Sequence, residues 1–156
     1  MPLYITTSRN PSEESLLLCR NLANTIPGST CERRGGKSVE KLAARARLLG
    51  KTRIAVITES GGKPSELGFI AVSQEGWDWL PARIAIRKYS FVKTGEMPEE
   101  VELRGSHAEL WRGLLDPRER EEGKGVLIDC SRKALRFSVG GKKVGEMEVD
   151  VVGGDI

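Results

Sequence analysis

The sequence predicts an α/β (α+β) fold in one compact domain. Strand-like runs rich in β-branched and aromatic residues alternate with segments whose apolar residues recur at helical spacing. The predicted order is βαβαβββ followed by αβββ, which is typical of two unequal halves in one compact unit. The length of 156 residues suits one domain, so we expect a single domain over residues 1–156.

The chain is expected to begin with a strand and a capped helix. Residues 3–7 are β-branched and aromatic and predict a strand. Residues 10–13 then give a helix start, with Asn10 as its cap and a capping-box pattern behind it. The helix is predicted to stop at residues 27–28, and a short strand to follow at 29–33.

A second helix is predicted from Ser38 to Gly50. Its apolar residues form one stripe, made of Val39, Leu42, Ala43, Ala46 and Leu49. The continuous apolar run that follows, at residues 54–58, is typical of a strand buried on both faces.

Two further strands complete the first half, at residues 67–72 and 84–91. A glycine-rich turn at residues 61–64 precedes the first of them. Between the two strands, Trp77 and Trp79 share one face if the segment is extended.

The second half is expected to hold one helix and three strands. Residues 94–105 are acidic and predict a loop, and Ser106 opens a second capping box that starts a helix. Residues 116–117 end that helix, and a charge-dense loop follows. The strands are predicted at 126–130, 135–139 and 144–149, with a turn at 140–141.

Charge is distributed unevenly between the halves. The net charge is +3, but about residues 1–93 hold 15 Lys and Arg against eight Asp and Glu, whereas 94–156 hold 10 against 14. The first half is therefore basic and the second acidic. Eight basic residues and one acid lie between Arg33 and Arg53. Such a cluster favours a polyphosphate partner, and a solvated helix face is the alternative.

Two loops carry groups suited to phosphate. Gly35 and Gly36 form a basic, glycine-rich turn before a helix, where exposed backbone N–H groups can bind an anion. The turn is not a nucleotide-binding P-loop, because Cys31 stands where that motif needs glycine. Ser8 and Arg9 join the first strand to a helix start, where plain helix capping is the alternative.

The residue types argue against an enzyme, a metal site and a cofactor. No carboxylate pair shares a segment with the single histidine, His107, and nothing in the sequence assembles a nucleophile, its base and an oxyanion site. Cys19, Cys31 and Cys130 are odd in number and widely spaced, so we expect reduced, buried thiols and no zinc site.

Several segments resemble the Brix-domain family in the same order. The run Thr6-Thr7-Ser8-Arg9-Asn10-Pro11-Ser12 resembles the family's TTSR-x-PS opening. Residues 31–38 are similar to its N-R-G-x-x-S element, although Glu32 replaces the asparagine, and residues 62–69 are similar to its G-x-P-x-x-L-x-F segment. The resemblance covers about the first 70 residues well, and the second half agrees mainly in element order.

This resemblance implies a ribosome biogenesis factor that binds ribosomal RNA precursors without catalysis, often beside ribosomal or assembly proteins. It also implies a Brix fold whose halves are similar to the anticodon-binding domain of class IIa aminoacyl-tRNA synthetases. The expected RNA-binding residues are Ser8, Arg9, Arg33, Arg34, Lys37, Lys41, Arg45 and Arg47.

Two other functions stay open. The domain could be a protein-interaction scaffold that uses Trp77, Trp79 and its acidic half to hold a basic ribosomal protein. It could also be a small nucleotide- or tRNA-related enzyme. The chain lacks a signal-peptide pattern and an apolar run of membrane-spanning length, so we expect a cytoplasmic protein without membrane contact.

Overall fold

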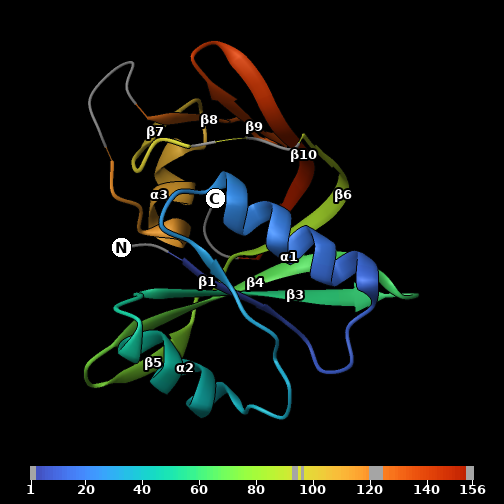
Figure 1. Cartoon of the computed structure of the whole chain (residues 1–156), viewed down its shortest axis with the longest axis vertical. Coiled ribbons are helices and arrows are strands. Elements are labelled where there is room, and N and C mark those ends of the chain that lie inside the picture. Colours follow the sequence, from blue (N-terminus) through green and yellow to red (C-terminus); the bar gives the residue numbers. More distant parts are fainter. Residues whose placement is uncertain (1–2, 93–94, 96, 120–124, 154–156) are drawn as a thin grey trace.

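The computed structural model describes residues 3–92, 95, 97–119 and 125–153, and its ten strands form one continuous sheet (Figure 1). Three helices pack on this sheet within the described residues. In chain order the elements are β1 (Leu3–Thr7), α1 (Glu13–Thr25), β2 (Thr30–Cys31), α2 (Val39–Leu48), β3 (Arg53–Ser60), β4 (Lys63–Ser73), β5 (Gly76–Trp79), β6 (Arg83–Phe91), β7 (Val101–Arg104), α3 (Ala108–Leu115), β8 (Val126–Cys130), β9 (Ala134–Val139) and β10 (Lys142–Val152). The mixed α/β class is confirmed.

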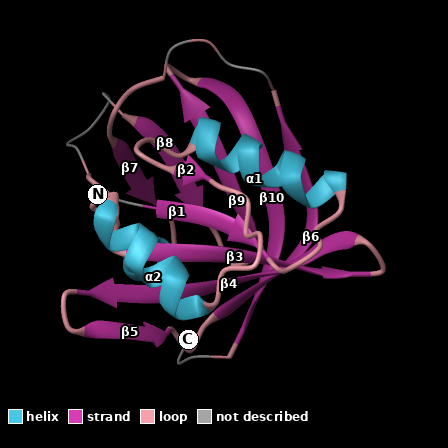
Figure 2. Ribbon diagram, turned by 60° about the horizontal axis from the view of Figure 1, so that its bottom comes forward, coloured by secondary structure: helices cyan, strands magenta, loops and turns pink. Residues whose placement is uncertain are grey.

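The strand order is β2-β1-β3-β4-β6-β10-β9-β8-β7, with β5 paired to β4 beside this path. β1 runs parallel to β2 and β3, β7 runs parallel to β8, and every other pair is antiparallel. The long strands β6 and β10 lie side by side (Figure 2). Through this pair, a first group of strands, β1 to β6, joins a second group, β7 to β10. The single-domain prediction agrees with this continuous sheet but stays a prediction.

Side-chain alternation along the parallel strands builds two apolar cores on opposite faces. Leu3 and Ile5 of β1 lie in the larger core with α1 and α3, whereas Tyr4 lies in the smaller core with α2. Figure 1 shows α1 and α3 on one side of β3 and β4, and α2 on the other. β3 is buried on both faces, as its continuous apolar run predicts.

The predicted helix caps are partly wrong. α1 begins two residues later than expected, because Ser12 caps it and Asn10 instead adopts a left-handed conformation with φ 55°. His107 occupies the cap position of α3 and makes no side-chain capping bond, so the second capping box does not form. Ser38 caps α2 as predicted, by accepting from the N–H of Lys41.

The acidic segment before α3 contains a strand that the sequence pattern does not reveal. β7 has four residues, with Val101 and Leu103 buried and Glu102 between them. Two apolar residues are too few for a periodic signal, and acidic neighbours mask them. Part of the predicted loop at 94–105 and of the charge-dense loop at 118–125 lies outside the described residues.

The expectation of three reduced thiols is wrong. A disulfide joins Cys19 of α1 to Cys31 of β2, across a Cα–Cα distance of 5.7 Å. Cys130 is a free, buried cysteine, and burial raises the pKa of its thiol to about 12. The sequence separation of 12 hides the pairing, because only the crossover from β1 through α1 to β2 brings the two residues together.

Candidate phosphate-binding site

The two predicted basic loops meet at the carboxyl ends of the parallel strands. β1 continues into α1 on the face of the larger core, whereas its neighbour β2 continues into α2 on the opposite face. In open α/β sheets, ligands bind in the crevice where connections from adjacent strands leave toward opposite faces. Ser8 and Arg9 follow β1, and the loop of residues 32–38 follows β2, so the two segments border this switch point and touch through Arg34 and Thr7. The surface that these two segments form is called the crevice below.

The loop of residues 32–38 is fixed to the end of β1 by polar contacts. The Glu32 N–H donates to Ile5 O at 3.0 Å, and Thr6 Oγ1 donates to Glu32 O at 2.8 Å. Arg34 Nη1 donates to Thr7 O at 3.2 Å, and Arg34 Nε donates to Lys37 O at 2.7 Å. Arg34 thus holds the loop in shape.

The electrostatics of Arg34 reflect this partly buried position. Burial lowers the pKa of its guanidinium, and the positive charge of nearby Arg9 lowers that pKa further. Arg9 and Arg34 therefore lie close enough for their positive charges to repel each other. An anion placed there relieves their repulsion.

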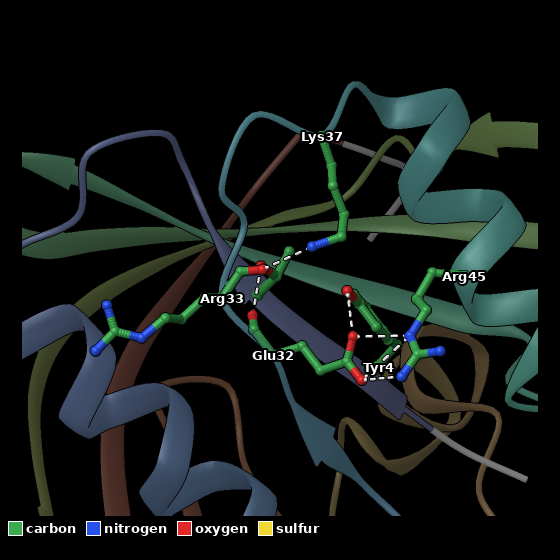
Figure 3. A network of polar contacts seen from close by, with 6 residues as sticks. Tyr4, Glu32, Arg33, Lys37 and Arg45 are labelled. Atoms are coloured by element: carbon green, nitrogen blue, oxygen red, sulfur yellow. Dashed lines mark hydrogen bonds and ion pairs between the residues drawn. The ribbon is translucent and has the colours of Figure 1, made fainter.

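Arg33 and Lys37 present positive charge from the same loop. Figure 3 shows the Arg33 guanidinium pointing away from Glu32, while Lys37 Nζ donates to the carbonyl oxygen of Arg33 at 3.2 Å. Among the described residues no carboxylate forms an ion pair with Arg9, Arg33 or Lys37. The Glu32 carboxylate interacts with Lys37 only at longer range, through its charge.

Arg45, which the sequence predicts as a contact to RNA, forms an ion pair with Glu32 at the protein surface. Its Nη2 lies 2.8 Å from Glu32 Oε2 and its Nε donates to Glu32 Oε1 at 3.0 Å (Figure 3). The Tyr4 hydroxyl donates to the same carboxylate at 3.1 Å. The hydrogen bond from Arg45 lowers the pKa of the Glu32 carboxyl, and burial raises the pKa of Tyr4 to about 12.

Arg47 and Lys41, the other two predicted residues of α2, differ in whether a contact within the protein holds their side chains. Arg47 Nε donates to Ser73 O at 2.7 Å and so ties α2 to the end of β4. Lys41 is exposed in the first turn of α2, and no ion pair holds it among the residues the structure covers. The eight predicted residues thus fall into three kinds. Four are cations without an ion pair in the described residues: Arg9, Arg33, Lys37 and Lys41. Three are arginines with structural contacts, Arg34, Arg45 and Arg47, and the last is the hydroxyl residue Ser8.

A protein carboxylate already occupies the N-terminus of α1. Glu59 Oε2 accepts from the Ser12 N–H at 2.8 Å and from the hydroxyls of Ser12 and Ser15, each at 2.5 Å. The hydrogen bond from Ser12 lowers the pKa of the Glu59 carboxyl. The predicted phosphate contact of Ser8 and Arg9 therefore depends on those two residues, because Glu59 already accepts hydrogen bonds at the end of this helix. Sequence reasoning missed both Glu32 and Glu59, since each acid finds its partner only in the folded chain.

The structure thus places a cluster of basic side chains at the end of a parallel strand pair in a mixed α/β domain, an arrangement that suits an anion. No group of three or more His, Cys, Asp and Glu side chains is placed to hold a metal ion in the described ranges. No helix of those ranges is long and apolar enough to cross a membrane.

Comparisons with known proteins confirm the resemblance seen in the sequence. A probable Brix domain-containing ribosomal biogenesis protein of Pyrobaculum aerophilum is 41% identical over 75 residues, which cover 48% of this chain and 41% of the relative. A protein of the same description from Methanopyrus kandleri is 28% identical over 109 residues, covering 70% of this chain and 52% of the relative. The matched segments thus span about half or less of these relatives' own length. No protein-family model matches the chain.

Solved structures show the same fold over nearly the whole chain. The crystal structure of a probable ribosomal biogenesis protein from Aeropyrum pernix matches with a TM-score of 0.79 at 24% identity, covering 99% of this chain and 97% of that one. The archaeal Imp4-like protein Mil matches with a TM-score of 0.73 at 19% identity, covering 97% and 99%. The chain therefore has the fold of archaeal ribosomal biogenesis and Imp4-like proteins. The likeness to the anticodon-binding domain stays a prediction.

Proposed function

We propose that this chain acts in ribosome biogenesis as a non-catalytic factor that binds ribosomal RNA precursors. The observation that carries the proposal is the crevice between β1 and β2, where Arg9, Arg33 and Lys37 keep positive charges without an ion-pair partner among the described residues. The printed names of the relatives supply the biological context, since they are ribosomal biogenesis proteins.

The contacts expected here position RNA rather than read its sequence. Arg9, Arg33 and Lys37 bind phosphate oxygens at the crevice, and Lys41 extends the charged surface along α2. Arg34 orders the loop from behind. Phosphate contacts fix the register of an RNA strand, whereas selectivity needs bases that stack on aromatic side chains or use their edges.

Trp79 is the aromatic side chain best placed for such stacking. It is 49% exposed on β5, whereas Trp77 packs against the smaller core. Tyr89 and Phe91 are engaged otherwise, because the Tyr89 hydroxyl donates to Glu14 and the Phe91 ring packs on Phe137. Trp79 is also the residue on which a protein partner would dock in the scaffold alternative.

A salt series with pre-16S ribosomal RNA tests the proposal. The variant carrying Arg9→Glu, Arg33→Glu and Lys37→Glu leaves Arg34 and its structural bonds intact. For single-stranded RNA the logarithm of the binding constant falls with the logarithm of salt by about 0.7 per phosphate contact. We expect wild type to bind with a steep slope and the variant to lose affinity and about two units of slope.

A matched variant controls for net charge. Arg118→Glu, Lys88→Glu and Lys142→Glu change the charge by the same amount at exposed side chains elsewhere. Thermal melts establish that both variants fold. Equal slopes for wild type and the crevice variant would reject RNA binding at this site and favour a protein partner, which Trp79→Ala would then disrupt.

A further inference from the structure

The two groups of strands repeat one topology. In the first, the parallel pair β1 and β3 is followed by the antiparallel strands β4 and β6; in the second, β7 and β8 are followed by β9 and β10. α1 follows β1, and α3 follows β7. The hairpin after β8 therefore occupies the place that the hairpin after β3 has in the first group.

These two equivalent hairpins differ in the charge of their turn residues, which are Gly61 and Gly62 after β3 and Arg132 and Lys133 after β8. The one after β3 supplies Glu59, whose carboxylate binds Ser12 at the start of α1. The one after β8 is the turn Ser131–Ala134, whose exposed corner consists of Arg132 and Lys133. Neither cation forms an ion pair with a carboxylate in the part of the chain that the structure describes. The second turn thus carries two cations where the first has two glycines, although both strands have an acid one residue before their end, Glu59 in β3 and Asp129 in β8.

A hollow of about 470 Å³ lies beside this turn. It is lined by His107, Arg132, Lys133, Asp150 and Val151. The carboxylate of Asp150 is already paired, because Arg87 Nε lies 2.7 Å from its Oδ2. That bond is the main cause of the lowered pKa of Asp150, and the charges of Lys133 and Arg132 contribute to it. Two cations thus line the hollow beside one carboxylate, which Arg87 already pairs.

The walls of the hollow are held in place by backbone contacts. The His107 N–H donates to Cys130 O at 3.0 Å, and the Ser131 N–H donates to Ala134 O at 2.9 Å. Gly105 has φ +99°, and a Cβ there would lie 2.3 Å from Cys130 O. The loop after β7 is thus pressed against the end of β8, which organises the site before any ligand arrives.

Strand direction places this hollow away from the first crevice. Each antiparallel pair reverses the chain, and five such pairs separate β3 from β8 along the sheet. β7 and β8 therefore run opposite to β1 and β3. The carboxyl ends of the two parallel pairs lie at opposite edges of the continuous sheet.

We propose that Arg132, Lys133 and His107 form a second phosphate-binding site for RNA, so that one chain can hold two RNA segments at opposite edges of its sheet. The identity of the ligand rests on the function proposed above. The second site itself rests on the unpaired cations, the fixed hollow and the repeated topology. Joining two segments gives the protein a means to bring distant parts of one RNA together.

A bridging assay tests this inference. Two uridine RNAs of about 12 nucleotides, one with a donor dye and one with an acceptor dye, are mixed with the full chain. Wild type is expected to produce energy transfer that rises with protein and falls again when protein exceeds RNA. Arg132→Glu with Lys133→Glu should abolish the transfer while a single labelled RNA still binds at the crevice.

The control and the outcomes separate the two proposals. Arg118→Glu with Lys142→Glu matches the charge change on exposed cations away from the hollow and should retain the transfer. Light scattering establishes that the bridging species contains one chain. Transfer that persists in the Arg132 and Lys133 variant overturns the second site alone. Failure of wild type to bind either RNA overturns both the second site and the proposed function.

Discussion

The Arg45 guanidinium and the Glu32 carboxylate form a bidentate ion pair, in which Nη2 lies 2.8 Å from Oε2 and Nε lies 3.0 Å from Oε1. The pair joins α2 to the loop that follows β2. It removes one positive charge from the surface that we expect to meet RNA. It also orients the loop whose free cations are Arg33 and Lys37.

Glu32→Gln should strengthen RNA binding. The substitution leaves Arg45 without its acid partner and adds one positive charge beside the crevice, so the salt slope should steepen by about 0.7. Glu40→Gln makes the same change of charge at an exposed residue that forms no ion pair in the described chain. The titration compares both variants with wild type. Equal gains would mean that total charge, and not the release of Arg45, controls affinity.

The same ion pair predicts a loss of stability in acid. The hydrogen bond from Arg45 lowers the pKa of Glu32 in the folded chain, so the native state favours the ionised carboxyl. Its contribution is fully present above the unfolded pKa of about 4.3 and is lost as pH falls through the lower folded pKa. Denaturant unfolding of wild type and Glu32→Gln from pH 7 to pH 3 measures this. The difference in free energy of unfolding between them should shrink toward low pH, and a constant difference would contradict the linkage.

Local pattern predicted the elements whose signals are contained within a few residues. Ser38 and the apolar stripe of α2 are adjacent in sequence, and both appear in the structure as expected. The two basic loops were predictable for the same reason, because a strand end followed by basic residues marks each of them in the sequence. The resemblance assigned both loops to RNA binding, and the structure brings Arg34 of the second loop to Thr7 and Arg9 at the end of the first strand.

Long-range pairings were beyond such reasoning. Glu59 reaches Ser12 across 47 positions, and Arg45 finds Glu32 only after α2 has folded back over β1. These pairings separate free cations from structural ones, a distinction that the sequence alone does not make; the eight RNA contacts stay a prediction. The strand β7 was missed because four residues with acidic neighbours carry too little periodicity.

Removal of the Cys19–Cys31 disulfide should destabilise the chain. The bond ties the two-residue edge strand β2 to α1 and closes a short loop in the unfolded chain. Loops of about 15 residues are worth about 3 kcal/mol in the chain-entropy model. Denaturant unfolding with and without a reducing agent should therefore differ by about 2–4 kcal/mol. Cys31→Ser is the control, and reductant should have no further effect on it.

Gly105→Ala tests the tight loop at the second hollow. The backbone there has φ +99°, and the added Cβ would meet Cys130 O at 2.3 Å and Asp129 Oδ1 at 2.8 Å. Because the backbone of β8 cannot move aside easily, we expect the free energy of unfolding to fall by about 3 kcal/mol. Gly36→Ala is the matched control, since nothing lies within 4 Å of its Cβ position and its φ is not positive. If both variants unfold at the same denaturant concentration, the loop after β7 does not press on β8, and the hollow lined by His107 and Arg132 loses its fixed wall.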